Sequence, residues 1–488
     1  MEAKKCGTIV LFPFMAQGHL NPFIDLARIL AFRFPDLIIT IVSTPGNVLN
    51  LRPLFRSTPS IRLAQLPFHS SDHGLPVNIE HTRALSRAAI SQLYHASQAL
   101  QPAFHRLISS IISHPDGPPL LSIVSDMFLA WTVEVANAFN VFHTVLYTSG
   151  PYAMSIYNSI WTHLPHTLTC ADEIKLPDLP HITIHRSQLS ENMKVATRES
   201  SAFVRQQAEY CRRADGGLWN TVDVIERLSL DDWSRSTGKP VWAIGPLAMI
   251  APKDGESDRR GGWEPGVPPL TCAGWLSLHP PGSVVYVSFG SQNSIGRPQM
   301  MELAKGLESS GVAFIWAVRP PIGFDADGDF DDEWLPEGFE DRMRERKQGL
   351  LIRKWAPQME ILGHPSMGAF ISHCGWNSML ESLSYGVPVI GWPLGSEQFY
   401  NSKLLAELGV CEEMARGTEE MVRGENIERV VREVLEGEKG RELRKRAERL
   451  REAMKRAVIE MNGVKGSSLV ALDEFVEILK SRTVIAKV

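Results

Sequence analysis

Short apolar runs recur along the chain, and longer segments with the period of a helix separate them. The runs span 8–14, 38–43, 120–125 and 142–147 in the first half, and 283–289, 314–319, 349–354, 369–372 and 387–392 in the second. Uninterrupted Val, Ile and Leu in short runs are typical of parallel strands that helices cover on both faces. The pattern therefore predicts a doubly wound α/β fold in each half of the chain.

The chain has 488 residues, which is more than one core of ordinary size organises, so two domains are expected. A segment dense in Gly, Pro and charged residues at 249–273 predicts the linker between them. The expected domains are an N-terminal one at 1–248 and a C-terminal one at 274–460.

Composition limits the class of protein. Hydrophobic residues make up 44% and charged residues 22%, which is the balance of a soluble globular enzyme. The net charge of −5 argues against nucleic acid as a partner. No apolar stretch reaches the roughly 18–20 residues of a spanning helix, so integral membrane association is not expected. The scattered cysteines form no CxxC pair and predict reduced thiols in a cytoplasmic protein.

A turn at 372–378, Ser-His-Cys-Gly-Trp-Asn-Ser, joins an apolar run to a helical segment. Gly375 would let a ligand approach the backbone, and Asn377 and Ser378 would add side-chain donors to the amides of the opening helix. These features predict an anion cradle, most naturally for a diphosphate. Glu381 lies one helical turn after Asn377 and could accept hydrogen bonds from a ribose diol, so a nucleotide is predicted.

Two further strand ends carry weaker signals. The ring of Trp355 could stack on a base, and the Ala356 backbone could read the base edge, although a Trp beside a strand is more often part of the core. Ser291, which follows Gly290 after another run, is a third candidate phosphate contact, although Gly-Ser after a strand is usually a plain turn.

In the first half, His19 and Asp126 both follow predicted strands. Pro22 favours a helix start next to His19, which places the imidazole where a general base could act. A parallel neighbouring strand could bring Asp126 beside it, and a buried carboxylate would fix the tautomer of the ring. A structural His and an Asp that caps the next helix are the alternatives.

The order and spacing of these residues resemble a known family. The 44-residue stretch at 355–398 resembles the signature box of plant family 1 UDP-glycosyltransferases, from Trp-Ala-Pro-Gln through Ser-His-Cys-Gly-Trp-Asn-Ser to Glu-Gln. The Gly-His-Leu-Asn-Pro after the first run and the Asp-x-Phe-x-x-Trp at 126–131 resemble the positions of the family's catalytic His and Asp. The resemblance covers essentially the whole chain.

The resemblance implies a GT-B fold, with two facing Rossmann-like doubly wound domains, a cleft between them, and residues 461–488 packed back on the N-terminal domain. It implies that Trp355 and Ala356 bind uracil and that Gln358 and Glu381 bind the ribose. The implied diphosphate contacts are Ser291, His373, Asn377 and Ser378, and the implied sugar contacts are Thr148, Trp376, Glu397 and Gln398.

The resemblance also implies a reaction, in which His19, oriented by Asp126, is the base for inverting transfer of a sugar from a UDP-sugar. Gln398 resembles the glucose-using members, whereas Glu397 departs from the more usual Asp and reaches one methylene further. No metal and no further cofactor are implied, and the expected protein is a monomer. Loops at 68–76, 81–94 and 192–203 suit a flat, partly apolar acceptor, first a flavonoid or other phenolic and next a terpenoid or steroid.

Other functions remain open at this point. The same site would serve a nucleotide-sugar epimerase or hydrolase, or a non-catalytic UDP-sugar sensor. A dinucleotide-dependent oxidoreductase needs three glycines after the first strand, whereas Met-Ala-Gln-Gly-His at 15–19 has one. Asp327-Gly328-Asp329 imitates a metal-binding Asp-x-Asp motif, but it lies in an acidic loop and not after a strand.

Overall fold

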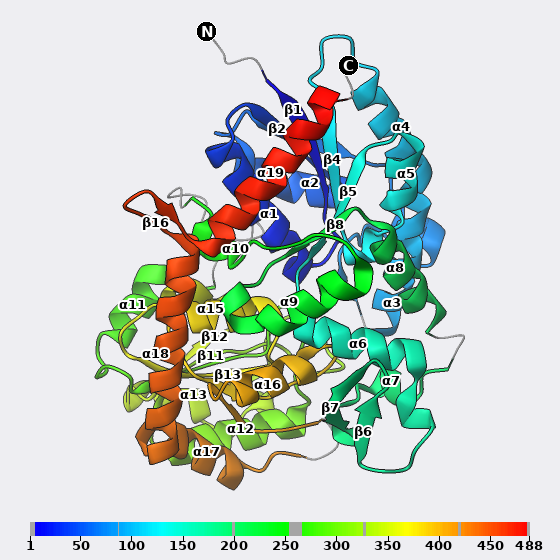
Figure 1. The fold of residues 1–488 in the computed structure, drawn as a ribbon. Coiled ribbons are helices and arrows are strands. Elements are labelled where there is room, and N and C mark those ends of the chain that lie inside the picture. The colour runs from blue at the N-terminus through cyan, green and yellow to red at the C-terminus, as the bar shows by residue number, and fades with distance from the viewer. Residues whose placement is uncertain are drawn as a thin grey trace. The chain divides into compact units, whose positions relative to one another are not determined.

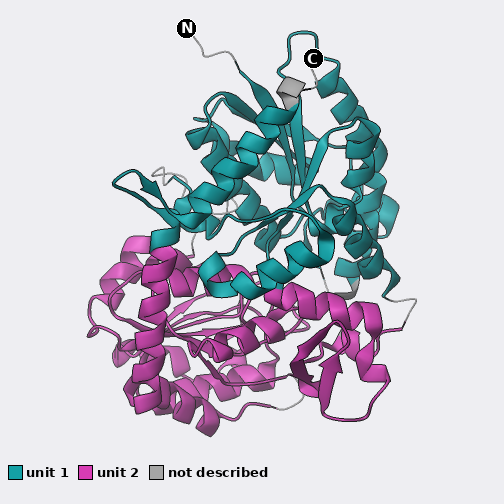
Figure 2. Ribbon diagram, in the orientation of Figure 1, with its two compact units in different colours: residues 1–151, 200–262, 456–488 teal, residues 152–199, 263–455 magenta. Residues whose placement is uncertain are grey.

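The computed structural model describes residues 5–85, 87–197, 201–252, 266–325, 328–417 and 421–485. Contacts divide the chain into two compact units, which Figure 2 distinguishes by colour. Unit 1 contains residues 1–151, 200–262 and 456–488, and unit 2 contains residues 152–199 and 263–455. Residues 152–199 belong to unit 2, whereas the N-terminal domain expected at 1–248 includes them. Of the expected linker, residues 253–265 lie outside the described residues.

Unit 1 is built on a parallel sheet in the order β3-β2-β1-β4-β5-β8-β9. Its strands are β1 (Gly7–Phe12), β2 (Leu37–Ser43), β3 (Ile61–Gln65), β4 (Leu120–Asp126), β5 (Phe142–Tyr147), β8 (Gly216–Trp219) and β9 (Val241–Ala243). The helices of this unit are α1 (Gln17–Arg33), α2 (Pro45–Leu51), α3 (Arg87–Ser97), α4 (Gln101–Ile112), α5 (Thr132–Ala138), α8 (Ala202–Arg213), α9 (Asp223–Thr237), α10 (Leu247–Ile250) and α19 (Ser467–Ile485).

Unit 2 repeats the architecture with a parallel sheet in the order β12-β11-β10-β13-β14-β15. Its strands are β10 (Val284–Ser288), β11 (Ala313–Ala317), β12 (Gly349–Ile352), β13 (Met367–Ser372), β14 (Val389–Gly391) and β15 (Cys411–Glu413). Its helices include α11 (Pro269–Leu276), α12 (Arg297–Ser310), α13 (Phe339–Glu345), α14 (Gln358–Leu362), α15 (Trp376–Ser384), α16 (Gln398–Glu407) and α17 (Gly424–Glu436). Helix α18 (Glu438–Val458) runs from this unit toward the last segment of unit 1.

The segment between β5 and α8 contains α6 (Pro151–His163), the hairpin β6 (Glu173–Leu176) and β7 (Leu179–His185), and α7 (Glu191–Lys194). Two side-chain contacts tie it to α16 within unit 2. The Tyr152 hydroxyl donates to Glu407 at 3.0 Å, and the Tyr400 hydroxyl lies 3.5 Å from the sulfur of Met193. A second hairpin, β16 (Glu460–Met461) and β17 (Val464–Lys465), precedes α19.

Each sheet is central because its strands are apolar on both faces. All six residues of β1 are buried, and α1 covers the sheet with Phe23, Ala27 and Leu30, which recur at helical spacing. Helix α19 places Leu472, Phe475, Val476 and Leu479 in the same core and contacts β9 and β4. The C-terminal helix is therefore part of unit 1.

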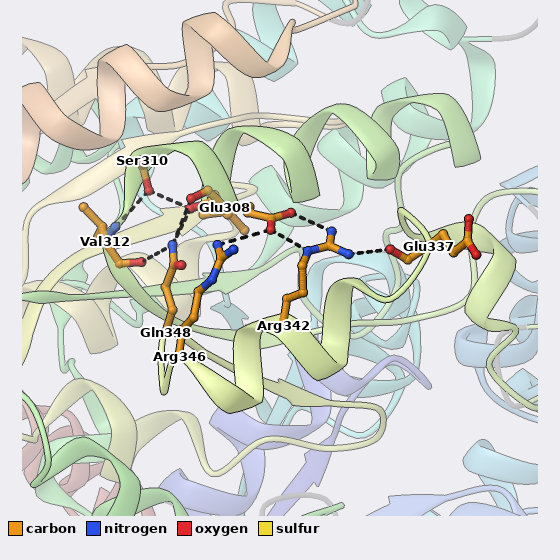
Figure 3. A network of polar contacts seen from close by, with 8 residues as sticks. Glu308, Ser310, Val312, Glu337, Arg342, Arg346 and Gln348 are labelled. Atoms are coloured by element: carbon orange, nitrogen blue, oxygen red, sulfur yellow. Dashed lines mark hydrogen bonds and ion pairs between the residues drawn. The ribbon is translucent and has the colours of Figure 1, made fainter.

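Unit 2 contains a polar network between α12 and the segment that leads to β12 (Figure 3). The Arg342 guanidinium donates twice to the Glu308 carboxylate, at 2.7 and 2.9 Å. The side-chain amide of Gln348 donates to the carbonyl oxygens of Leu307, Glu308 and Val312. These bonds satisfy carbonyls at the C-terminus of α12 and fix the turn into β11.

The predicted doubly wound α/β architecture is confirmed in both units. The run at 142–147 forms β5 with the predicted bounds, and the other runs form strands whose ends differ by a few residues. The short strands β3, β8, β9 and β15 were not predicted. The six cysteines are free thiols, and no helix among the described residues is long and apolar enough to cross a membrane.

Candidate active site

Each sheet has one point at which the strand order reverses, and several of the predicted site residues lie at these two points. In unit 1, β1 lies between β2 and β4; His19 follows β1, and Asp126 ends β4. In unit 2, β10 lies between β11 and β13; Ser291 follows β10, and His373 follows β13. Open α/β sheets bind their ligands at such points, beyond the carboxyl ends of the strands.

His19 and Asp126 form a close pair in unit 1. Nδ1 of His19 lies 2.7 Å from Oδ2 of Asp126, whose side chain is completely buried. The other carboxylate oxygen accepts the backbone N–H of Phe128 at 2.9 Å. A buried carboxylate at this distance favours the tautomer with the proton on Nδ1, which leaves Nε2 as the proton acceptor of the ring.

Thr148 also reaches the imidazole. Its Oγ1 lies 3.2 Å from Nδ1 of His19, and the residue is buried at the end of β5. Resemblance alone implies that Thr148 contacts the sugar, and the structure places it beside the histidine. The strand ends of β1, β4 and β5 therefore bring three of the predicted residues together.

Aromatic rings lie around His19, and some of them come from the predicted acceptor loops at 81–94 and 192–203. Ring centroids of Phe14 and Phe128 lie 5.8 and 5.3 Å from the His19 ring. Tyr94 of α3 extends the group, 4.4 Å from Phe128 and 5.7 Å from Phe203. Tyr94 and Phe203 belong to loops that the sequence predicts at the acceptor, but their contacts had no signal in the sequence, because the two residues come from distant segments.

His373 is the buried centre of the predicted cradle in unit 2. Burial lowers its pKa to about 4, so the imidazole is neutral at pH 7. Its Nδ1 has no hydrogen-bond partner among the described residues. A buried polar atom without a partner is the kind of group that a bound ligand completes.

Two glycines make room for the His373 ring. A Cβ at Gly375 would lie 2.4 Å from Nε2, and a Cβ at Gly290 would lie 2.6 Å from the same atom. Gly290 also has a φ of 79°, which side chains rarely adopt. Gly375 is the N-cap of α15, so the ring lies at the positive end of that helix.

The two residues expected at the ribose contact each other. Nε2 of Gln358 donates to Oε2 of Glu381 at 2.7 Å and to Oγ of Ser378 at 3.0 Å. Gln358 begins α14, and the other two lie on α15 one turn apart. The predicted residues from these two helices are therefore brought into one polar cluster.

The residues on either side of the α15 N-cap are largely buried. Trp376 is 2% exposed, and Asn377 beside it is half-buried. Cys374 is fully buried with a φ of 63°, and its carbonyl accepts a bond from the Asn401 amide at 2.9 Å. The left-handed residue and the amide fix the path of the backbone into the helix.

The remaining predicted residues line neighbouring strand ends. Ala356 is buried and Trp355 is half-buried, with its carbonyl accepting the N–H of Gly266 at 2.8 Å. The carbonyl of Ser291 accepts a bond from Arg319. Glu397 is the N-cap of α16, and Oε1 of Gln398 accepts the N–H groups of Leu394 and Gly395 at 3.1 and 3.0 Å. The Gln398 amide thus holds its own loop through its oxygen.

The part of the chain that the structure describes contains no preformed metal site. Groups of three or more His, Cys, Asp or Glu side chains placed to hold an ion are absent there. Asp327 of the acidic loop lies outside the described residues.

Comparisons with known proteins match both units. A family model described as Glycosyltransferase, N-terminal domain, matches residues 7–249, and one described as UDP-glucoronosyl and UDP-glucosyl transferase matches residues 267–451. UDP-glycosyltransferase 92A1 of Arabidopsis thaliana is 40% identical over 480 residues, which cover 96% of each chain. Crocetin glucosyltransferase 3 of Crocus sativus is 42% identical over 449 residues, covering 88% of this chain and 91% of the relative.

A solved structure is similar over the same length. The crystal structure of Glycyrrhiza uralensis UGT73P12, complexed with glycyrrhetinic acid 3-O-monoglucuronide, matches with a TM-score of 0.84 and 30% identity. The match covers 99% of this chain and 98% of the other.

Proposed function

This chain belongs to plant family 1 of the UDP-glycosyltransferases, and we propose that His19 is its catalytic base. It is a hexosyltransferase that transfers a sugar from a UDP-sugar to a plant metabolite. Its two parallel-sheet units are the Rossmann-like domains of the GT-B fold.

The pairing of His19 with Asp126 carries the proposal. A completely buried carboxylate 2.7 Å from Nδ1 stabilises the imidazolium that forms when Nε2 takes a proton. The side chain of His19 is 22% exposed, so the ring is open to a ligand although its partner is not. General-base assistance of this kind contributes about 100-fold to 10,000-fold to a rate.

The proposed reaction is a single displacement. The acceptor hydroxyl gives its proton to Nε2 of His19 as its oxygen attacks the anomeric carbon. The bond from that carbon to the UDP oxygen breaks, and its electron pair leaves with the diphosphate. Attack opposite the leaving group inverts the α linkage of the donor to a β linkage in the product.

The donor site proposed for unit 2 stabilises the departing charge. His373, Asn377, Ser378 and Ser291 would hold the diphosphate, and the amides at the N-terminus of α15 would add fixed dipoles. Gln358 and Glu381 would share the ribose, with Trp355 and Ala356 at the uracil. Trp376, Glu397, Gln398 and Thr148 would contact the sugar, for which glucose is proposed.

The acceptor proposed first is a flavonoid or other phenolic, and next a terpenoid or steroid. Support comes from the rings of Phe14, Phe128 and Tyr94 around the base, because aromatic faces stack well on planar molecules. One relative is named a crocetin glucosyltransferase, so crocetin belongs in the same test.

The experiment is a panel of acceptors incubated with UDP-glucose and the full chain. The panel contains a flavonol, a simple phenol, crocetin and glycyrrhetinic acid, with mass spectrometry of the products. A hexose gain on the phenolics, with a β linkage in the proton NMR spectrum, is expected. An α linkage would overturn the inverting displacement, and transfer confined to the terpenoid acids would overturn the phenolic acceptor.

A further inference from the structure

The segment after β5 leads from the sheet toward α6 and carries Thr148, which contacts His19. Its sequence at 147–151 is Tyr-Thr-Ser-Gly-Pro. A second segment, Trp-Asn-Thr-Val-Asp-Val-Ile-Glu at 219–226, leads from the neighbouring strand β8 into α9. No residue of this second segment takes part in the proposed reaction.

Glu226 is an unusual residue of α9. It is only 3% exposed, and its φ of −131° and ψ of 28° interrupt the helix. The hydroxyl of Thr221 donates to its Oε2. An interrupted helix with a buried carboxylate costs free energy, so the position of this side chain calls for a structural reason.

The carboxylate of Glu226 occupies the space beside Gly150. A Cβ built on Gly150 would lie 2.4 Å from Oε1 and 2.6 Å from Oε2. Every residue other than glycine would displace the carboxylate or the backbone. Glu226 therefore packs directly on the backbone two residues beyond Thr148.

Other contacts hold the same segment at both of its ends. Nε1 of Trp233, also on α9, donates to the Pro151 carbonyl at 3.3 Å. The ring of Tyr147 stacks on Trp219 with centroids 3.9 Å apart and planes 7° apart. The backbone N–H of Asn220 donates to the Tyr147 carbonyl at 3.0 Å. The segment is thus fixed before and after Thr148 by β8 and α9.

We propose that Glu226 is a positioning residue for the base, a role that rests on the proposed function of His19. By filling the space beside Gly150, its carboxylate holds the backbone where Oγ1 of Thr148 reaches Nδ1 of His19, at 3.2 Å. Thr148 and Asp126 then bind the same ring nitrogen from two strand ends and restrict rotation of the imidazole. Nε2 stays directed at the acceptor hydroxyl.

The test is a double-mutant cycle with Glu226→Gln and Thr148→Val in the full chain. Glu226→Gln is expected to lower kcat about tenfold to 100-fold, as small misplacements of catalytic groups do, with an unchanged KM for UDP-glucose. Because Glu226 acts through Thr148, the double variant should be no slower than Thr148→Val alone. The pH profile of kcat should change in the same way in both single variants.

Two further variants keep the test decisive. Gly150→Ala retains the charge of Glu226 but displaces its carboxylate, so it should also lower kcat and leave the KM for UDP-glucose unchanged. This variant tests the role of Glu226 even if Glu226→Gln folds poorly. Asp231→Asn, an exposed position on the same helix, should match the wild type.

The outcomes separate the two claims. Additive losses of kcat in the double variant would overturn the role of Glu226, and so would a wild-type kcat in both Glu226→Gln and Gly150→Ala. In either case an inactive His19→Ala would still support His19 as the base. Full activity of His19→Ala would overturn the base, and the role of Glu226 with it.

Discussion

The carboxylate of Asp126 accepts the backbone N–H of Phe128 through Oδ1 while its Oδ2 contacts His19. The backbone donor fixes which oxygen faces the imidazole. An asparagine at this position would keep its carbonyl oxygen on the Phe128 amide, so its NH₂ group would face Nδ1 of His19. The amide would then donate to Nδ1 and move the ring proton to Nε2, where the base must be free.

Asp126→Asn is therefore expected to lower kcat about 100-fold to 10,000-fold, the range of general-base catalysis, with little change in the KM for UDP-glucose. Steady-state kinetics on the most active acceptor measure this. Asp116→Asn, at an exposed position of the loop before β4, is the matched control. A kcat for Asp126→Asn equal to that of the control would refute the orienting role.

Gly375→Ala is expected to weaken UDP binding strongly, because its Cβ would lie 2.4 Å from Nε2 of His373. The ring is buried among strand ends, so it has little room to move. The Kd for UDP is expected to rise about tenfold or more, which corresponds to about 1.4 kcal/mol of lost binding free energy. Calorimetry with UDP measures this change. Gly274→Ala on α11, where nothing lies within 4 Å of the new Cβ, should bind UDP normally. Equal affinities would show that the cradle does not depend on this packing.

The ion pair of Glu308 and Arg342 should make stability depend on pH in the acid range. The Arg342 guanidinium, through its hydrogen bonds, lowers the pKa of Glu308 below its usual 4.5. A lowered folded-state pKa contributes stability above the unfolded pKa and loses it as pH falls through the folded value. Because Arg342 is partly exposed, Glu308→Gln should cost about 0.2–1 kcal/mol at pH 7.

Urea unfolding at pH 7 and at pH 3 tests this pair. The difference between wild type and Glu308→Gln should shrink at the lower pH, because the wild-type carboxylate loses its charge as the pH falls through its lowered pKa. Glu345→Gln, an exposed position on α13, should show a smaller effect at both values. An equal difference in unfolding free energy between wild type and Glu308→Gln at both pH values would mean that the charge of Glu308 does not contribute to stability.

Much of the fold could be predicted from the sequence because the central strands are apolar on both faces. The run at 142–147 is buried throughout and gives β5 its predicted ends. In contrast, β3 has only one buried residue of five, and β8 starts with two glycines. Edge strands and glycine-rich strands lack the apolar signal, since packing and not composition determines them.

The candidate site could be predicted where the residues follow strands within a recognisable motif. Because His19 and Asp126 both follow predicted parallel strands, the sequence suggested that they could meet, and the pairing of β1 with β4 brings them together. Two relationships had no local signal. The loop at 81–94 was expected at the acceptor, but the contact of Tyr94 with Phe128 was not, and Glu226 reaches Gly150 from an interrupted helix. Both contacts join residues far apart in the chain.

Turnover should persist without added metal, because amides and side-chain donors are proposed to stabilise the leaving diphosphate. The initial rate with UDP-glucose in excess EDTA is expected to equal the untreated rate. Loss of activity in EDTA and its return with Mn²⁺ would contradict the metal-independent reaction and direct attention to the acidic loop.

The initial rate of sugar transfer by His19→Ala tests the central claim most directly. The account predicts a rate at least about 100-fold below the wild type, since general-base catalysis is lost. His114→Ala, at an exposed position after α4, should retain the wild-type rate. A wild-type rate for a folded His19→Ala that still binds UDP would contradict the assignment of His19 as the base.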